Sequence, residues 1–190
     1  MIISHHSILK TWSHGFVKKA GMLVLFVTWI HCLTAQTVSS DEYKVKAVFL
    51  YNFTRFVDWP QASFEASYDP FIIGIIGKDP FGGSIQEAVA GERIGAHSIK
   101  VVHFDDAIEI EKCHILYVGT SDQDEVRNIV SKARGKGVLT VSDIPNFIRW
   151  GGMIRFYTEN NRIRLEINNT MAKEAGIKIS SKLLRVANVL

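Results

Sequence analysis

The chain has 190 residues, of which 47% are apolar and 22% are charged, with 14 glycines and 4 prolines. This ordinary globular composition excludes a disordered polymer, a collagen-like repeat and a disulfide-dense mini-protein. The formal net charge of +3 would favour an anionic partner, such as a nucleic acid or an acidic membrane, only if the charge belonged to the folded part of the chain.

The positive charge lies in an N-terminal leader. Residues 1–35 contain three lysines and no acidic residue, and a short apolar run covers residues 21–30. A basic segment, an apolar run too short to span a bilayer and small residues ending at Ala35 are typical of a secretory signal peptide. An uncleaved membrane anchor is the alternative. We therefore predict a signal peptide over residues 1–35 and one exported α/β domain over residues 36–190, with no membrane span after cleavage.

The exported domain is neutral, because 19 basic residues remain against 19 acidic ones. No basic cluster is left, so the electrostatic footprint of nucleic-acid binding is missing and we expect no nucleic-acid partner. Of the two cysteines, Cys32 leaves with the leader and Cys113 stays. We expect Cys113 to be a buried thiol, with a redox or intermolecular role as the alternative.

The first predicted element is a helix that begins at Ser40 and Asp41 and ends before Trp59 and Pro60, because a residue that precedes proline avoids helical angles. Apolar side chains recur at helical spacing along it and predict the face that packs on the core. They are Val45, Val48, Phe49, Phe53, Phe56 and Val57.

The middle of the chain alternates strands with helices. Apolar runs predict strands at residues 71–77, 98–104, 115–118 and 138–141, while helices are predicted from Asp79 and Pro80 to Ala90 and from Asp122 to Arg134. Runs that are apolar on both alternating faces are typical of a parallel sheet covered on two sides. The sequence therefore predicts a three-layer α/β/α fold with a mostly parallel sheet.

The end of the chain predicts an antiparallel hairpin, with strands at residues 153–157 and 162–167, followed by a last helix. That helix is expected to carry Ile179, Leu183, Val186, Ala187 and Leu190 on one face. In the hairpin, alternation directs the charged side chains away from the apolar ones. The charged residues are Arg155, Arg162, Arg164 and Glu166. They predict either cross-strand ion pairs or a patch that binds carboxylates or another protein.

Motifs for chemistry are few. Gly77 and Gly82 have the spacing of a phosphate-binding loop, but Gly83 stands where the motif needs lysine, so we interpret the glycines as a steric turn, with an anion site as the alternative. The histidines of the exported domain, His97, His103 and His114, lack metal-ligand spacing. No nucleophile motif occurs. We predict no catalytic residue, no cofactor and no metal; an unrecognised hydrolase is one alternative, and a small-ligand-binding protein serving a membrane receptor or sensor kinase is another.

Several segments together resemble the YfiR family of exported regulators. The resemblance begins at residues 42–53 and runs on to Trp59 and Pro60. It continues at residues 77–82 and 113–117, then at Gly151–Ile154 and Asn161–Asn168, and ends at Ala175, Gly176 and residues 179–184. The order and spacing of these segments cover nearly the whole exported domain.

The resemblance implies a periplasmic protein without catalytic activity that represses an inner-membrane diguanylate cyclase, lowering cyclic-di-GMP signalling and biofilm formation. It also implies a homodimer, for which the exposed side of the first helix, around Tyr51 and Arg55, is one possible surface. Internal disulfides that tune repression in relatives cannot form here, since only Cys113 remains.

Overall fold

The computed structural model describes residues 41–60, 63–64 and 69–190. The signal peptide predicted over residues 1–35 lies outside these residues. The fold that follows is that of the compact unit Glu42–Leu190. No helix within the described ranges is long and apolar enough to cross a membrane.

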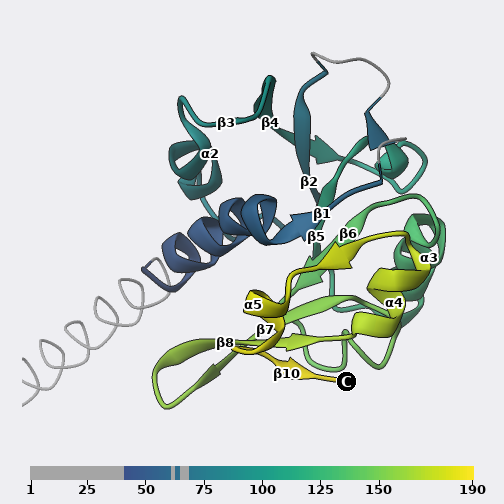
Figure 1. Cartoon of the computed structure of the whole chain (residues 1–190). Helices are drawn as coiled ribbons and strands as arrows, with labels where there is room; N and C mark the ends of the chain where they lie inside the picture. The colour runs from purple at the N-terminus through teal and green to yellow at the C-terminus, as the bar shows by residue number, and fades with distance from the viewer. Residues whose placement is uncertain (1–40, 61–62, 65–68) are drawn as a thin grey trace, which may run out of the picture. The chain divides into compact units, whose positions relative to one another are not determined.

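An eight-stranded sheet forms the centre of the fold, in the order β10-β8-β7-β6-β5-β2-β4-β3 (Figure 1). Its strands are β2 (Phe71–Gly77), β3 (Arg93–Ile94), β4 (His97–Phe104), β5 (Ile115–Gly119), β6 (Leu139–Ser142), β7 (Ile154–Glu159), β8 (Arg162–Ile167) and β10 (Asn188–Val189). Two short strands, β1 (Val57–Asp58) and β9 (Lys178–Ile179), pair separately.

Five neighbouring strands, β4-β2-β5-β6-β7, run parallel. The hairpin β7-β8 is antiparallel, as the sequence predicted. Strand order reverses between β2 and β5, because β4 is added on one side of β2 and the later parallel strands on the other. Proteins with this doubly wound order bind ligands outside the carboxyl ends of the strands at the reversal.

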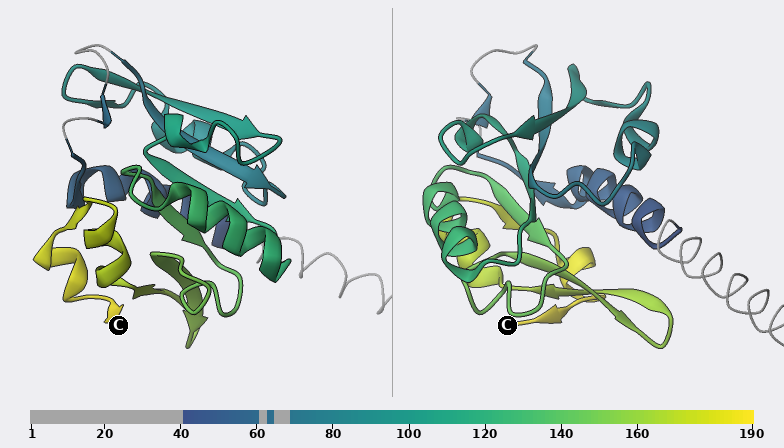
Figure 2. Two further views of the ribbon diagram at one scale, coloured as in Figure 1. Left: turned by 90° about the vertical axis from the view of Figure 1, so that its right-hand side faces the viewer. Right: turned by 180° about the vertical axis from the view of Figure 1, so that it is seen from behind.

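Helices cover both faces of the sheet, which confirms the predicted three-layer α/β/α arrangement. The helix at residues 41–56 packs on one face with α2 (Ser84–Val89), α4 (Asn169–Glu174) and α5 (Ser181–Leu184). On the other face lie α3 (Gln123–Ala133) and the short 3-10 helix Ile110–Lys112. Figure 2 shows α3 and the first helix on opposite sides of the strands. Each face therefore has its own apolar core.

The first helix buries the later part of the predicted face, where Phe53 is fully buried and Phe49 and Phe56 pack on the core, but not its earlier part. Val45 and Val48 are 47% and 49% exposed, whereas Ala47, Leu50 and Phe53 are fully buried. The helix has apolar side chains around most of its circumference, so periodicity alone did not decide which stripe faces inward. The buried stripe also contains Lys46, which has a carboxylate partner in the sheet layer.

The turn after β2 also differs from the prediction, because α2 begins at Ser84 and not near Pro80. The Asp79 carboxylate accepts a hydrogen bond of 2.8 Å from the Phe81 N–H. An aspartate that binds the backbone two residues on makes a turn instead of a helix cap. Gly82 and Gly83 then adopt positive φ angles before the helix starts.

The hairpin extends beyond its neighbouring strands. β6 pairs only with Ile154 and Arg155, and β10 pairs only with Glu166 and Ile167. Residues 156–165 therefore form a two-stranded arm, hereafter the arm, which projects from the sheet in Figure 1. Asn160 and Asn161, at φ 50° and 58°, form the two-residue turn whose twist matches that of the strands.

The predicted last helix is wrong. Ile179 belongs to β9, and the helix that follows has only four residues, Ser181–Leu184. Val186 and Leu190 are 68% and 60% exposed. Periodicity read this segment as one helix because its apolar spacing suits either structure. Pairing of residues 178–179 with β1 and of residues 188–189 with β8 overrides that pattern.

Candidate functional site

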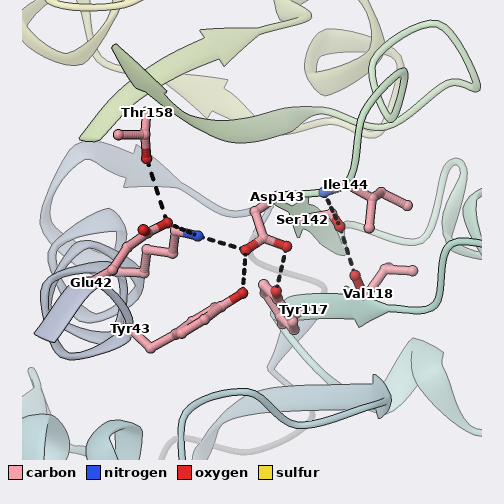
Figure 3. A network of polar contacts seen from close by, with 9 residues as sticks. Glu42, Tyr43, Tyr117, Val118, Ser142, Asp143, Ile144 and Thr158 are labelled. Atoms are coloured by element: carbon pink, nitrogen blue, oxygen red, sulfur yellow. Dashed lines mark hydrogen bonds and ion pairs between the residues drawn. The ribbon is translucent and has the colours of Figure 1, made fainter. Parts of the chain in front are cut away.

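A polar cluster lies at the carboxyl end of β6, under the first two turns of the first helix (Figure 3). At its centre is Asp143. Its carboxylate accepts hydrogen bonds from the hydroxyl of Tyr43 at 2.8 Å, the ammonium of Lys46 at 2.5 Å and the hydroxyl of Tyr117 at 2.8 Å. Lys46 also forms an ion pair of 2.7 Å with Glu42, one helical turn away. We call these five residues the Asp143 cluster.

The charged and polar groups of the Asp143 cluster satisfy one another. Burial opposes ionisation of Asp143, but the hydrogen bond and charge of Lys46, with the two tyrosine hydroxyls, outweigh it and lower the pKa of the carboxyl group. Burial and the nearby Asp143 raise the pKa values of the Tyr43 and Tyr117 hydroxyls. Both hydroxyls therefore stay protonated as donors, and neither is activated as a nucleophile or base.

The arrangement fits a structural role. Lys46 is only 3% exposed, and a buried ammonium needs partners on every side. The cluster ties the first helix to β5, to the end of β6 and, through a 3.4 Å hydrogen bond from Thr158 to Glu42, to the arm. Sequence reasoning missed it, although a lysine placed between Tyr43 and Leu50 on the buried stripe was a signal that it needed a carboxylate partner.

At the strand reversal the backbones at the ends of β2 and β5 lie in close contact. The Lys78 N–H donates a 3.2 Å hydrogen bond to the Gly119 carbonyl, joining the ends of β2 and β5. A Cβ on Gly119 would lie 2.0 Å from the Lys78 carbonyl oxygen. This contact between two backbones has no space for a side chain at Gly119, and the positive φ angles of Gly77, Gly82 and Gly83 fit the tight-turn interpretation of those glycines.

Two of the three histidines, His97 and His114, pack on the same Phe64 ring, with centroids 4.4 and 4.5 Å away, whereas His103 lies at the other end of β4 from His97. His103 pairs with Asp79 at 2.8 Å on the surface. His114 is buried between Phe64 and Phe71, and its Nδ1 accepts the Ile72 N–H at 3.1 Å. Burial lowers the pKa of His114 to about 4. Within the described ranges no group of three or more metal-ligating side chains is found.

Cys113 is buried, as expected. It is 4% exposed, and its thiol donates a hydrogen bond of 3.0 Å to the Ile110 carbonyl. Burial raises its pKa, so the reactive thiolate is disfavoured.

The outer face of the hairpin carries all four predicted charged residues together. Arg155 pairs with Glu166 at 2.6 Å, both about one-fifth exposed, and its guanidinium lies over the Tyr157 ring at 5.2 Å. Arg164 lies 3.7 Å from Glu159, and both are about half exposed. Cross-strand pairing therefore accounts for the base of the hairpin, while the arginines of the arm stay accessible.

The two residues proposed on the first helix make contacts within the chain. The Tyr51 hydroxyl donates to the Glu92 carboxylate and accepts a 3.2 Å hydrogen bond from Arg55. These contacts attach the helix to the loop after α2. The exposed valines, Val45 and Val48, lie on the same helix and were missed as surface residues.

Among the shallow depressions of the described surface are two that lie away from the Asp143 cluster. One, of about 480 Å³, lies between the 3-10 helix and the end of α3, beside Ile108 and Lys132. The other, of about 360 Å³, is lined by Pro60, Lys136 and Glu174 among others. Neither contains a buried charged group aimed into it, so the exposed arm is the more distinctive feature.

These features define an α/β domain whose central polar cluster is engaged in its own fold and whose hairpin presents accessible arginines. Comparison with known families matches residues 43–188 to the family described as YfiR/HmsC-like. The chain belongs to this family, as the sequence resemblance predicted. The family is one of periplasmic regulators and not of enzymes.

Other comparisons add little detail. No curated protein matches the chain. Among solved structures, a similar chain is that of the ABC domain in complex with L-Trp from Streptococcus pneumonia, with a TM-score of 0.44 and 14% identity over 63% of this chain and 54% of that one. The chain thus spans about half the length of that structure.

Proposed function

We propose that the protein is a periplasmic regulator that docks on the exported domain of an inner-membrane diguanylate cyclase and inhibits it. Membership of the YfiR/HmsC-like family over residues 43–188 is the observation that carries this proposal. The Asp143 cluster, whose polar groups bind one another, and the exposed Arg164 of the hairpin support recognition through a surface over recognition through a pocket.

Control by docking requires different affinities for two states of the cyclase. A regulator that binds the inactive state more tightly shifts the population toward it by that difference. The outer face of the hairpin, with Arg155, Arg162, Arg164 and Glu166, is the proposed docking surface. In this proposal the predicted leader directs export to the periplasm.

Crosslinking in cells followed by capture from membranes tests the proposal. The tagged full-length chain is expressed so that the exported form reaches the periplasm, and captured proteins are identified. Recovery of an inner-membrane diguanylate cyclase is expected, together with lower cyclic-di-GMP in cells that express the protein. Capture of no inner-membrane signalling protein would contradict it.

We also propose a homodimer, with the first helix around Tyr51 and Arg55 as its surface. Light scattering of the exported protein at micromolar concentration is expected to give the dimer mass. Arg55→Glu should shift it toward the monomer, while Arg127→Glu on α3 should leave it unchanged. A monomer in the native protein would refute the dimer without affecting the docking proposal.

A further inference from the structure

The arm is held on one face and open on the other. Phe156 packs against Phe49 and Phe53 of the first helix, each with ring centroids 5.9 Å apart, and Thr158 donates a hydrogen bond to Glu42. On the opposite face, α3 covers the sheet over β5 and β2 and does not reach the arm, whose residues are absent from that core. Both long edges of the arm also lie beyond their neighbouring strands.

The outer face of the arm has more positive than negative groups. Glu159 is opposite Arg162 in the strand register and 3.7 Å from Arg164, so one carboxylate lies next to two guanidiniums. Arg162 forms no ion pair within the part of the chain that the structure describes. At the base of the hairpin, by contrast, Arg155 and Glu166 neutralise one another at 2.6 Å.

The two open arginines have a defined spacing. Arg162 and Arg164 are two residues apart on one strand, so they point to the same face about 6.6 Å apart. Tyr157 lies opposite Arg164 and adds an aromatic surface beside it. The two-residue turn at Asn160 and Asn161 closes the ladder at Glu159 and Arg162, so the arm holds its arginines on one paired strand before binding, which lowers the entropic cost of recognition.

We infer that the outer face of the arm binds an extended acidic segment of the partner protein, with two carboxylates two residues apart. This inference rests on the proposed function and names the chemistry of its docking surface. An extended chain repeats its side chains on one face at the spacing of Arg162 and Arg164. Each guanidinium can bind a carboxylate with two parallel hydrogen bonds, which gives geometric as well as charge selectivity.

Nuclear magnetic resonance of the arginine Nε–H groups tests the inference on the purified exported protein. The probe is a blocked peptide, Ser-Glu-Ser-Glu-Ser, and its control replaces both glutamates with glutamine. The Nε–H signals of Arg162 and Arg164 are expected to shift with the glutamate peptide alone, and less at high salt. Equal shifts with both peptides, or no shift, would overturn the inference.

Two double variants separate geometry from charge. Arg162→Gln with Arg164→Gln is expected to weaken the peptide about tenfold or more, whereas Arg127→Gln with Arg185→Gln removes the same charge elsewhere and should keep binding. Arg162→Lys with Arg164→Lys should bind with intermediate strength. Equal weakening by the control variant would show only a net-charge effect and overturn the inference. Circular dichroism verifies that each variant folds.

Membrane capture distinguishes this inference from the proposed function. If Arg162→Gln with Arg164→Gln still captures the cyclase as well as the native protein, the acidic-segment site is wrong and the docking proposal stands. If the native protein binds the glutamate peptide through both arginines but captures no membrane protein, the docking proposal fails and the site stands.

Discussion

The Asp143 cluster and the arm are both rich in charge, and they use it in opposite ways. In the Asp143 cluster, a buried ammonium and a largely buried carboxylate satisfy each other and two tyrosines. In the arm, one carboxylate lies beside two accessible guanidiniums and is paired, at 3.7 Å, with that of Arg164. Charge removed from water has to be matched within the protein, whereas charge left in water is free for a partner. The contrast therefore separates residues that hold the fold from residues available for docking.

Removing the centre of the Asp143 cluster is expected to have the largest effect. Asp143→Ala leaves Lys46 buried beside two tyrosine hydroxyls without its main acceptor, which should lower the free energy of unfolding by about 3–5 kcal/mol. Urea denaturation measures it. Glu42→Gln is the matched control, since Glu42 is one-third exposed, and should cost about 1 kcal/mol or less. If Asp143→Ala lowers the free energy of unfolding by less than about 1 kcal/mol, the cluster does not hold the first helix in place.

The backbone contact between Gly119 and Lys78 gives a second test of how tightly the interior is packed. Gly119→Ala forces a Cβ against the Lys78 carbonyl and should cost about 2–3 kcal/mol, because two backbones have to separate. Thermal denaturation measures the loss. Gly82→Ala is the control: its Cβ would meet open space, and only its positive φ of 56° opposes the change, so about 1 kcal/mol is expected. Equal losses of stability for Gly119→Ala and Gly82→Ala would show that the contact between Gly119 and Lys78 is not tight.

Acid should destabilise the protein through the buried His114. Burial lowers the pKa of His114 from 6.5 to about 4, so the unfolded chain takes up the proton more readily. Stability is fully present above pH 6.5 and should fall as the pH drops from 6.5 to 4, by about 1.4 kcal/mol per unit at most.

Urea denaturation across that range measures the effect. His114→Asn is the control, because its amide oxygen can still accept the Ile72 N–H but does not titrate. The variant should lose less stability over the same range. An identical pH dependence would assign the effect to other groups.

The smallest effect on stability is expected in the hairpin. Arg155→Ala with Arg164→Ala removes one ion pair that is about one-fifth exposed and one loose, accessible pair, which should cost about 1 kcal/mol. The same variant should lose much of its capture of the membrane partner. Denaturation measures the stability of the variant, and crosslinking on the same preparation measures its capture of the membrane partner. Unfolding of the variant would mean that the hairpin arginines serve the fold.

Local patterns were enough to predict most of the fold. The apolar runs at β2, β4, β5 and β6 and the amphipathic pattern of α3 gave the parallel sheet and its second layer. The hairpin followed from alternation around Asn160 and Asn161. These elements have one strong periodicity each, so the sequence allowed a single interpretation.

Features that depend on distant partners could not be predicted in the same way. Asp143 and Tyr43 are 100 residues apart, and no short motif contains both. On the first helix, the burial of Lys46 became explicable only with its partner Asp143, which lies 97 residues away in the sequence. The end of the chain depended on pairing of residues 178–179 with β1. For the hairpin, the charged face was predictable. The division between its neutral base and its open arm depended on which residues pair with β6 and β10.

The burial of Cys113 has a practical consequence. The chain has two cysteines, and Cys32 lies in the predicted leader. Cys113 is therefore a single reporter, placed just before β5 in the core under α3. A thiol reagent can reach it only when that core opens, so its labelling rate measures the frequency of opening without any added probe. Compared with and without the membrane partner, that rate would tell whether docking on the arm also tightens the interior.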